Sequence, residues 1–178
     1  SRGFLKRCVE TSEFKTATDG ALVKQQRMVD REVVLRFVAF RLLDDISEYR
    51  SLGPMEDLLL KTTERLDNPK DIGDKELERI FQDLLQGLRL SEMIFGPNAF
   101  RKWPLNADRR SPFNRALFET WTYSLASLET DEVAPIAGQI ANEARKLMTD
   151  DVDYLNSITV STGDVRRVEY RFATVKLI

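Results

Sequence analysis

Asp30-Arg-Glu-Val-Val-Leu-Arg-Phe-Val-Ala-Phe-Arg-Leu-Leu43 is the stretch of sequence from which the fold can be derived. From Val33 onward, Arg36 and Arg41 are the only residues in it that are not apolar. A helix that is apolar nearly all round is buried in the centre of a domain, because it has no face that suits water. The apolar run alone would also suit a strand, but the helical pattern of its neighbours favours a helix. We therefore expect a buried central helix near residues 30–44, with Asp30 as its N-cap.

Apolar residues recur at helical spacing on both sides of this segment. Proline, glycine and capping residues divide them into further helices, which we expect from Phe4, after Thr11 or Ser12, from Pro54 to Asn68, from Asp74 to Phe95, from Ser111-Pro112, after Asp131 and after Asp164. Residues 18–28 and 96–111 are expected to form loops. The sequence thus predicts an all-α fold class, with one compact helical domain over residues 1–178 and seven to nine helices around the central one.

The composition excludes several kinds of chemistry. The 178 residues include no histidine and one cysteine, Cys8, so histidine bases, Ser-His or Cys-His nucleophiles and Cys/His zinc sites are impossible. A single cysteine also rules out an internal disulfide and indicates a reducing, cytoplasmic compartment. The net charge of −2 gives no overall attraction to nucleic acid or anionic lipid, and no apolar run is long enough to cross a membrane. We expect no cofactor, no metal and no enzymatic activity in this chain.

Two stretches are more specific than the helical pattern. The first is RMVDREVVLRFVAF, from Arg27 to Phe40, and the second is Phe95-Gly-Pro-Asn-Ala-Phe-Arg101, followed by residues 114–119. In this order and spacing they resemble the helical C-terminal part of the ParB/sulfiredoxin-like family of GmrSD-type restriction proteins. The resemblance covers most of the chain from Phe4 onward. It implies a piece of a longer prokaryotic phage-defence protein, whose N-terminal domain would be a partner of this chain.

The sequence departs from that family in its catalytic signatures. The family resemblance implies a nucleotide-binding Asp-Gly-Gln-Gln-Arg motif in the N-terminal domain, but here Asp19-Gly20 and Gln25-Gln26-Arg27 are split by four residues. Without histidine, no HNH nuclease site can exist in this chain. The resemblance therefore implies a non-catalytic helical module for domain docking, with nucleic-acid contact as a further role. The alternative is a stand-alone helical protein–protein interaction domain unrelated to nucleic acid.

Residues 101–115 are the candidate nucleic-acid contact. They hold five basic side chains against one acidic side chain, in a chain that is acidic overall. Cations beside an aromatic ring suit phosphate contact and base stacking. The candidate contact residues are Arg101, Lys102, Trp103, Arg109, Arg110 and Arg115. The simpler interpretation, which we favour, is a solvated loop whose tryptophan packs back on the core.

Two acidic features carry weaker signals. Glu13-Phe14-Lys15 matches the end of a metal-dependent nuclease signature, but the upstream aspartate and the two strands of such a site are missing. Asp150, Asp151 and Asp153 could bind a hard cation, although acidic residues at this place more often favour a helix N-terminus.

Arg36 carries the sharpest structural prediction. It lies well inside the expected central helix, and burying a guanidinium without a partner costs several kcal/mol. Glu32 is four residues earlier, in the favourable order for a helical ion pair. A second carboxylate, from Glu119 or Asp74, would complete the pairing because the guanidinium has five donors. The functional alternative is that Arg36 faces the N-terminal domain of the parent protein and helps to dock it.

Overall fold

The structure is a computed structural model that describes residues 2–22 and 28–178. All regular secondary structure in these residues is helical, with an isolated bridge between Arg101 and Phe113 as the one strand-like pairing. The predicted all-α fold class is therefore confirmed, and the described residues form a single packed body. They contain ten α-helices rather than the expected seven to nine, because η3 divides the helix expected after Asp131 into α7 and α8, and the short α9 is additional.

The described helices cover most of the chain. In order, they are α1 (Arg2–Val9), α2 (Ser12–Ala17), α3 (Val29–Arg41), the 3-10 helix η1 (Ile46–Ser51), α4 (Met55–Asp67), α5 (Asp74–Phe95), η2 (Gly96–Asn98), α6 (Arg115–Leu125), α7 (Thr130–Val133), η3 (Ala134–Ile136), α8 (Ala137–Asp150), α9 (Val152–Ser157) and α10 (Val165–Val175).

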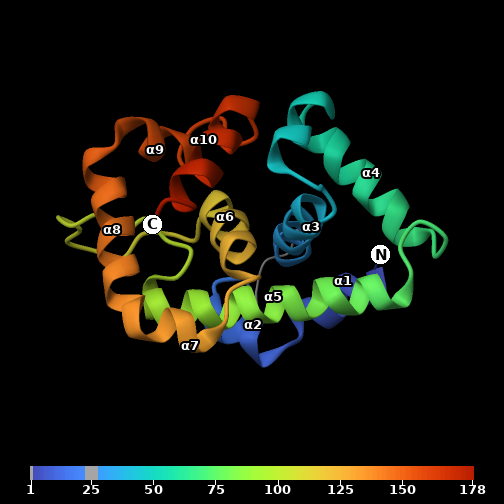
Figure 1. The fold of residues 1–178 in the computed structure, drawn as a ribbon, viewed down its shortest axis with the longest axis horizontal. Helices are drawn as coiled ribbons and strands as arrows, with labels where there is room; N and C mark the ends of the chain where they lie inside the picture. The colour runs from blue at the N-terminus through green and yellow to red at the C-terminus, as the bar shows by residue number, and fades with distance from the viewer. Residues whose placement is uncertain (1, 23–27) are drawn as a thin grey trace.

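Helix α3 is the buried centre of the fold, as its sequence predicts. It packs against α1, α4, α5 and α6, and Figure 1 shows it between α4 and α6, above the long α5. Its N-terminus differs from the expectation, because the N-cap is Met28, with a φ of 53°, and not Asp30. Asp30 lies in the first turn, where its carboxylate accepts a hydrogen bond from the backbone N–H of Arg31 at 2.8 Å.

The α3 side chains enter two buried clusters. The larger one joins α3 to α1, α2, α5, α6, α8 and α9. The smaller one joins the end of α3 to η1, α4 and α10 through Ala39, Phe40, Tyr49, Met55, Leu58, Val168 and Phe172. The central helix therefore connects the two halves of the core.

Two other helix starts differ from the sequence prediction. Helix α6 begins at Arg115, not at Ser111-Pro112, because the Asn114 side chain caps it by accepting from the Leu117 N–H at 2.9 Å. The segment before it is extended, and the N–H of Asn114 donates to the carbonyl of Phe100 at 2.8 Å. Helix α7 is capped by Glu129, which forms a capping box with Glu132, so the expected cap at Asp131 was wrong.

Several expected boundaries agree with the structure. Thr11 caps α2, Asp164 caps α10, and α5 runs from Asp74 to Phe95 as its spacing predicts. Of the loop expected over residues 18–28, the structure describes residues 18–22 and 28. The Gln25-Gln26-Arg27 triplet lies outside the described residues.

Helices α5 and α6 cross in backbone contact at Gly87. A Cβ atom built on Gly87 would lie 2.3 Å from the carbonyl oxygen and 2.9 Å from the Cα of Thr122. Both atoms belong to the backbone, so no side-chain rotation can relieve the clash. The absence of a side chain at Gly87 is what lets the two helices approach this closely.

We predict that Gly87→Ala lowers the free energy of unfolding by about 3 kcal/mol, because one of the two helices must shift. The matched control is Gly138→Ala in α8, where a built Cβ meets nothing within 4 Å. That change should be neutral or stabilise by about 0.5 kcal/mol through helix propensity. Urea unfolding followed by circular dichroism measures both, and equal stabilities of the two variants would contradict the close-contact argument.

Candidate functional site

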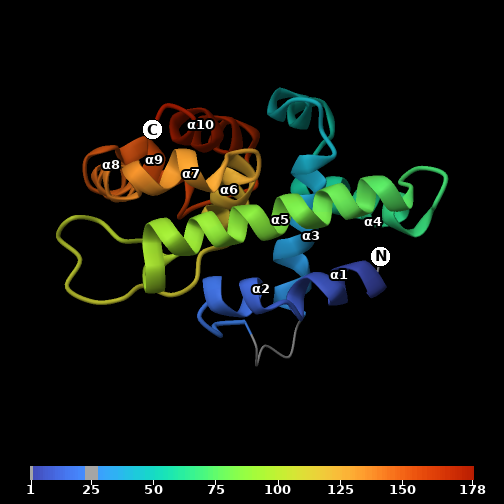
Figure 2. The same ribbon diagram turned by 60° about the horizontal axis from the view of Figure 1, so that its bottom comes forward.

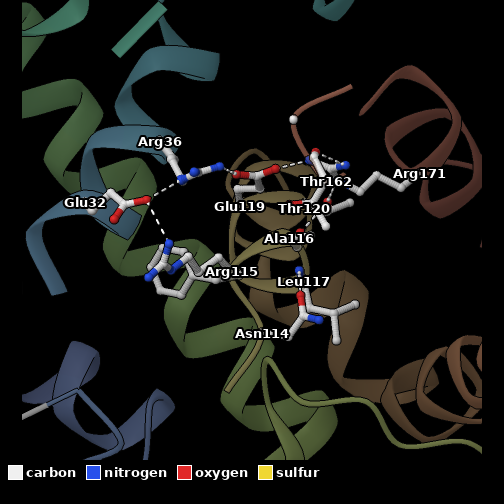
Figure 3. Close-up of polar contacts among 12 residues, drawn as sticks. Glu32, Arg36, Asn114, Arg115, Ala116, Leu117, Glu119, Thr120, Thr162 and Arg171 are labelled. Atoms are coloured by element: carbon white, nitrogen blue, oxygen red, sulfur yellow. Dashed lines mark hydrogen bonds and ion pairs between the residues drawn. The ribbon is translucent and has the colours of Figure 1, made fainter. Parts of the chain in front are cut away.

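The most deeply buried charges of the molecule are Glu119 on α6 and Arg171 on α10. Both side chains have 0% exposure, and they form an ion pair between Glu119 Oε1 and Arg171 Nη2. Figure 3 shows the pair at one end of a chain of polar contacts that continues to α3. A buried charge is stable only if it is paired and its remaining donors are used.

Arg171 uses its other donors on α6 again and on two further segments. Its Nε donates to the hydroxyl of Thr120 at 3.2 Å. Its Nη1 donates to the carbonyls of Ser157 at 3.2 Å and Thr162 at 2.8 Å. The guanidinium thus ties α10 to α6, to the end of α9 and to the loop between α9 and α10.

Arg36 is paired within the chain, through Glu32 and Glu119. Its Nε lies 3.1 Å from Glu32 Oε1, and its Nη1 lies 3.4 Å from Glu119 Oε2. Of the two candidates for the second carboxylate, the structure selects Glu119, whereas Asp74 is exposed at the start of α5. Burial by itself lowers the pKa of Arg36, but the charges of Glu119 and Glu32 outweigh it and leave the pKa raised. Arg36 is therefore a structural residue, and its proposed use in docking an N-terminal domain loses its basis.

Arg115 extends the chain of contacts to the surface. Its Nη1 lies 3.2 Å from Glu32 Oε1, the oxygen that also meets Arg36. Both oxygens of Glu119 likewise accept from arginines. Glu119 therefore has both oxygens engaged within the fold, and we assign the cluster to stability.

The loop 101–115 contains fewer accessible cations than the sequence suggests. Arg110 Nη1 lies 2.6 Å from Asp19 Oδ2, and Arg101 Nη1 donates to the carbonyl of Ser111 at 2.8 Å. Burial, together with the nearby charge of Arg110, lowers the pKa of Arg101. With Arg115 paired to Glu32, three of the five candidate cations already have partners.

Trp103 packs against the body of the protein. Its ring lies under the guanidinium of Arg145, at 4.3 Å from the ring centroid, and its backbone N–H donates to Met148 Sδ at 3.3 Å. This placement favours the solvated-loop interpretation. In the part of the chain that the structure describes, Lys102 and Arg109 are the two loop cations without an ion pair or hydrogen bond, and Figure 2 shows the loop extending beyond the end of α5.

The weaker candidates have structural roles. Glu13 lies 2.7 Å from Arg89 and ties α2 to α5, and the bond from Arg89 lowers the pKa of this carboxyl. Asp151 caps α9 and accepts a hydrogen bond from the Tyr170 hydroxyl at 2.8 Å. Cys8 is completely buried, which raises the pKa of its thiol to about 12. In residues 2–22 and 28–178, no three acidic or thiol side chains gather closely enough to hold a metal ion.

The described surface has a groove of about 680 Å³, and no sequence signal pointed to it. Its lining comes mainly from η1, the second half of α6 and the second half of α10. It includes apolar residues, among them Trp121, Leu125, Ile140 and Val175, and polar residues, among them Arg41, Tyr123, Ser127 and Lys176. This volume is typical of a ligand or segment-binding site.

The walls of the groove are fixed by contacts between η1 and α10. The Tyr49 hydroxyl donates to the carbonyl of Gly163 at 2.6 Å, and burial raises the pKa of Tyr49 to about 12. Arg50 pairs with both oxygens of Glu169, at 3.1 and 2.7 Å. The buried Tyr49 contact, together with the exposed Arg50 pair, therefore holds η1 against α10 and the residues just before it.

Comparison with known proteins gives no relative. No protein family, no curated protein and no solved structure matches this chain. Among the described helices, none combines the length and the apolar character that crossing a membrane requires. Any assignment of function therefore starts from the groove and the loop themselves.

Two features of the site escaped the sequence analysis for different reasons. Arg171 stands on the apolar stripe of α10, three residues after Val168 and four before Val175, so its position on the stripe was a usable signal of burial. The groove has no such signal, because its walls come from segments that are far apart in the sequence.

We predict that Glu119→Gln lowers the free energy of unfolding by about 3–5 kcal/mol, because it leaves the Arg171 guanidinium buried without its counter-charge. Glu143→Gln, which removes the exposed pair with Lys146 at 2.8 Å, is the control and should cost about 0.5 kcal/mol or less. Denaturant unfolding of both variants is the measurement. A loss for Glu119→Gln no larger than the control's would mean that the buried pair is not needed for stability.

Proposed function

We propose that this chain is a non-catalytic helical docking module, and that its groove receives a helix from another domain or protein. The observation that supports this proposal most is the groove between η1, α6 and α10. The buried charges of the described chain are engaged in structural pairs, whereas Leu128 and Ile178 at the groove remain open to a partner.

The exposed apolar residues near the groove favour a macromolecular partner. Leu128 and Ile178 line the groove and are 39% and 36% exposed, and Leu177 beside them is 87% exposed. Exposed apolar side chains that cluster around a concave site usually mark an interaction surface. A partner that covers them gains the stabilisation of apolar burial, which is roughly 25 cal/mol per Å².

The backbone chemistry of the groove favours a helical partner. Helices α6 and α10, which border the groove, bond their own backbone groups, and the described residues contain no open strand edge. An extended peptide binds best where it can add a strand to such an edge. A helix satisfies its own backbone and needs only an apolar face to lie in a groove.

The resemblance to GmrSD-type restriction proteins adds a context for this role. Under that proposal, the partner is another domain of the same phage-defence protein. Under the alternative of a stand-alone interaction domain, the partner is a separate protein. The groove would bind a helix in both cases. The sequence of the full-length parent protein would distinguish the two.

We predict that the groove selects ligands from a phage-displayed library of helix-favouring peptides of about 16 residues, roughly four turns. Ala173→Arg places a long side chain in the groove from an exposed position on α10, and it should weaken binding of the selected peptides at least about tenfold with little effect on stability. Ala134→Arg, at an exposed position outside the groove lining, is the matched control. Failure to select any peptide that Ala173→Arg blocks would refute the docking function.

A second proposal is nucleic-acid contact at the loop 101–115. It is supported by Lys102 and Arg109, which have no partner among the described residues and lie on a segment that extends from the body (Figure 2). Two cations provide few phosphate contacts, so we expect weak binding without sequence preference.

We predict that Lys102→Glu with Arg109→Glu reduces the slope of log affinity against log salt by up to about 0.9 per lost phosphate contact on duplex DNA. Lys61→Glu with Arg65→Glu on α4 changes the net charge by the same amount and serves as the control. Anisotropy titrations with labelled DNA at several salt concentrations separate the two. If both double variants behave alike, DNA responds only to net charge and the loop is not a contact site.

A further inference from the structure

We infer that Asp19 restrains nucleic-acid contact at the loop 101–115, by holding the Arg110 guanidinium that a phosphate group would otherwise bind. This inference rests on the proposed nucleic-acid contact of the loop and adds an autoinhibitory residue to it. The Asp19 carboxylate competes with phosphate from within the chain, so a nucleic acid gains the contact with Arg110 only by displacing it.

The position of Asp19 opposite the loop is fixed by the way in which α2 ends. The N–H of Asp19 donates to the carbonyl of Thr16 at 3.0 Å, and the N–H of Gly20 donates to the carbonyl of Lys15 at 3.1 Å. These two bonds form a Schellman motif, in which Asp19 has the left-handed conformation with a φ of 49°. Glycine is the usual residue at this position because it has no Cβ. The carboxylate of Asp19 is therefore not needed to end the helix, and its contact with the loop is a separate feature.

The contact between Asp19 and the loop is an exposed ion pair. Arg110 Nη1 lies 2.6 Å from Asp19 Oδ2, and the two side chains are 39% and 54% exposed. An ion pair that water reaches contributes little to stability and is weakened by salt. The other arm of Arg110, Nη2, donates to the carbonyl of Pro97, which keeps the guanidinium at the base of the loop. Phosphate oxygens accept charge-assisted hydrogen bonds from a guanidinium as a carboxylate does, so a phosphate group can take the place of Asp19.

The base of the loop carries positive charge that Asp19 partly cancels. The guanidinium of Arg101 donates to the carbonyl of Ser111 at 2.8 Å and has no carboxylate within 4 Å among the described residues. Burial, followed by the charge of Arg110, lowers the pKa of Arg101, whereas the charge of Asp19 acts to raise it. The Arg101 guanidinium is thus close enough to respond to both neighbours. Once Asp19 is displaced, two neighbouring cations remain, and this arrangement attracts an anion.

The two unpaired cations of the loop lie directly beside these arginines in the sequence. Lys102 follows Arg101, and Arg109 precedes Arg110. A nucleic acid that contacts Lys102 and Arg109 therefore brings further phosphates close to the base of the loop. Binding begins at the unpaired cations and gains another phosphate contact when Asp19 is displaced.

The test compares DNA binding by the native protein and by Asp19→Asn, in anisotropy titrations of labelled duplex DNA at several salt concentrations. Asparagine tolerates the left-handed conformation and removes the charge. We expect Asp19→Asn to bind DNA about fivefold more tightly, and the slope of log affinity against log salt to steepen by up to about 0.9 for the added phosphate contact. Asp44→Asn, at an exposed position between α3 and η1, makes the same change in net charge. This control should have a smaller effect and leave the slope unchanged.

Arg110→Gln identifies the residue through which Asp19 acts. In a double-mutant cycle, Asp19→Asn should have no more effect than Asp44→Asn once Arg110 is replaced. A gain from Asp19→Asn that is the same with and without Arg110→Gln would overturn the inference. Equal effects of Asp19→Asn and Asp44→Asn on the native background would overturn it as well.

The double variant Lys102→Glu with Arg109→Glu separates this inference from the proposed nucleic-acid contact. If that variant reduces the salt slope but Asp19→Asn behaves like its control, the inference about Asp19 fails and the contact at the loop stands. If no variant, Asp19→Asn included, changes DNA binding beyond the effect of net charge, both proposals fail together.

Discussion

The burial of one carboxylate, that of Glu119, determines how the second half of this molecule is arranged. Glu119 lies on α6 with no exposure to water, so the chain must bring cations to it from two directions, Arg36 from α3 and Arg171 from α10. Arg171 in turn requires carbonyls from the segments on either side of the α9–α10 loop. Helices α3 and α10 are therefore placed against α6 by the need to satisfy a charge, in addition to the burial of apolar area.

The polar contacts that hold α10 and η1 in place also leave the groove between them open. Helix α10 is held to α6 by Arg171, and η1 is held to α10 by Tyr49 and Arg50. These contacts fix the walls, yet none of them fills the space between the second halves of α6 and α10. The charges of the Glu119 cluster are thus paired within the fold, whereas Leu128 and Ile178 at the groove remain exposed. This division is the physical basis for placing the interaction surface at the groove and not at the buried cluster.

The central helix and its charged residue could be predicted, because their signal is local. A run of apolar residues with Arg36 inside it leaves few arrangements other than a buried helix with a paired guanidinium, and Glu32 stands one turn away. The long α5 could also be predicted, from the helical spacing of its apolar residues. The start of α6 was not, since Ser111-Pro112 has the chemistry of a helix start, and only the tertiary bond from Asn114 to Phe100 keeps the segment extended.

The groove and the pairing of the loop cations depend on contacts between distant segments. The salt bridge between Arg110 and Asp19 joins residues that are 91 positions apart, about half of the chain length, and no pattern near either residue indicates it. The groove lining combines the end of α3 with α6 and α10. Such arrangements follow from packing, which local periodicity does not encode.

The close contact at Gly87 also restricts how the molecule can move. The Thr122 backbone rests against Gly87 at the crossing of α5 and α6, so α6 cannot slide along α5 without driving backbone into backbone. Rotation about the crossing is the motion that remains, with the contact acting as a pivot. The residues of α6 that line the groove start at Trp121, directly beside this pivot. A helix in the groove would therefore contact α6 within one turn of Glu119, the carboxylate that pairs with both α3 and α10.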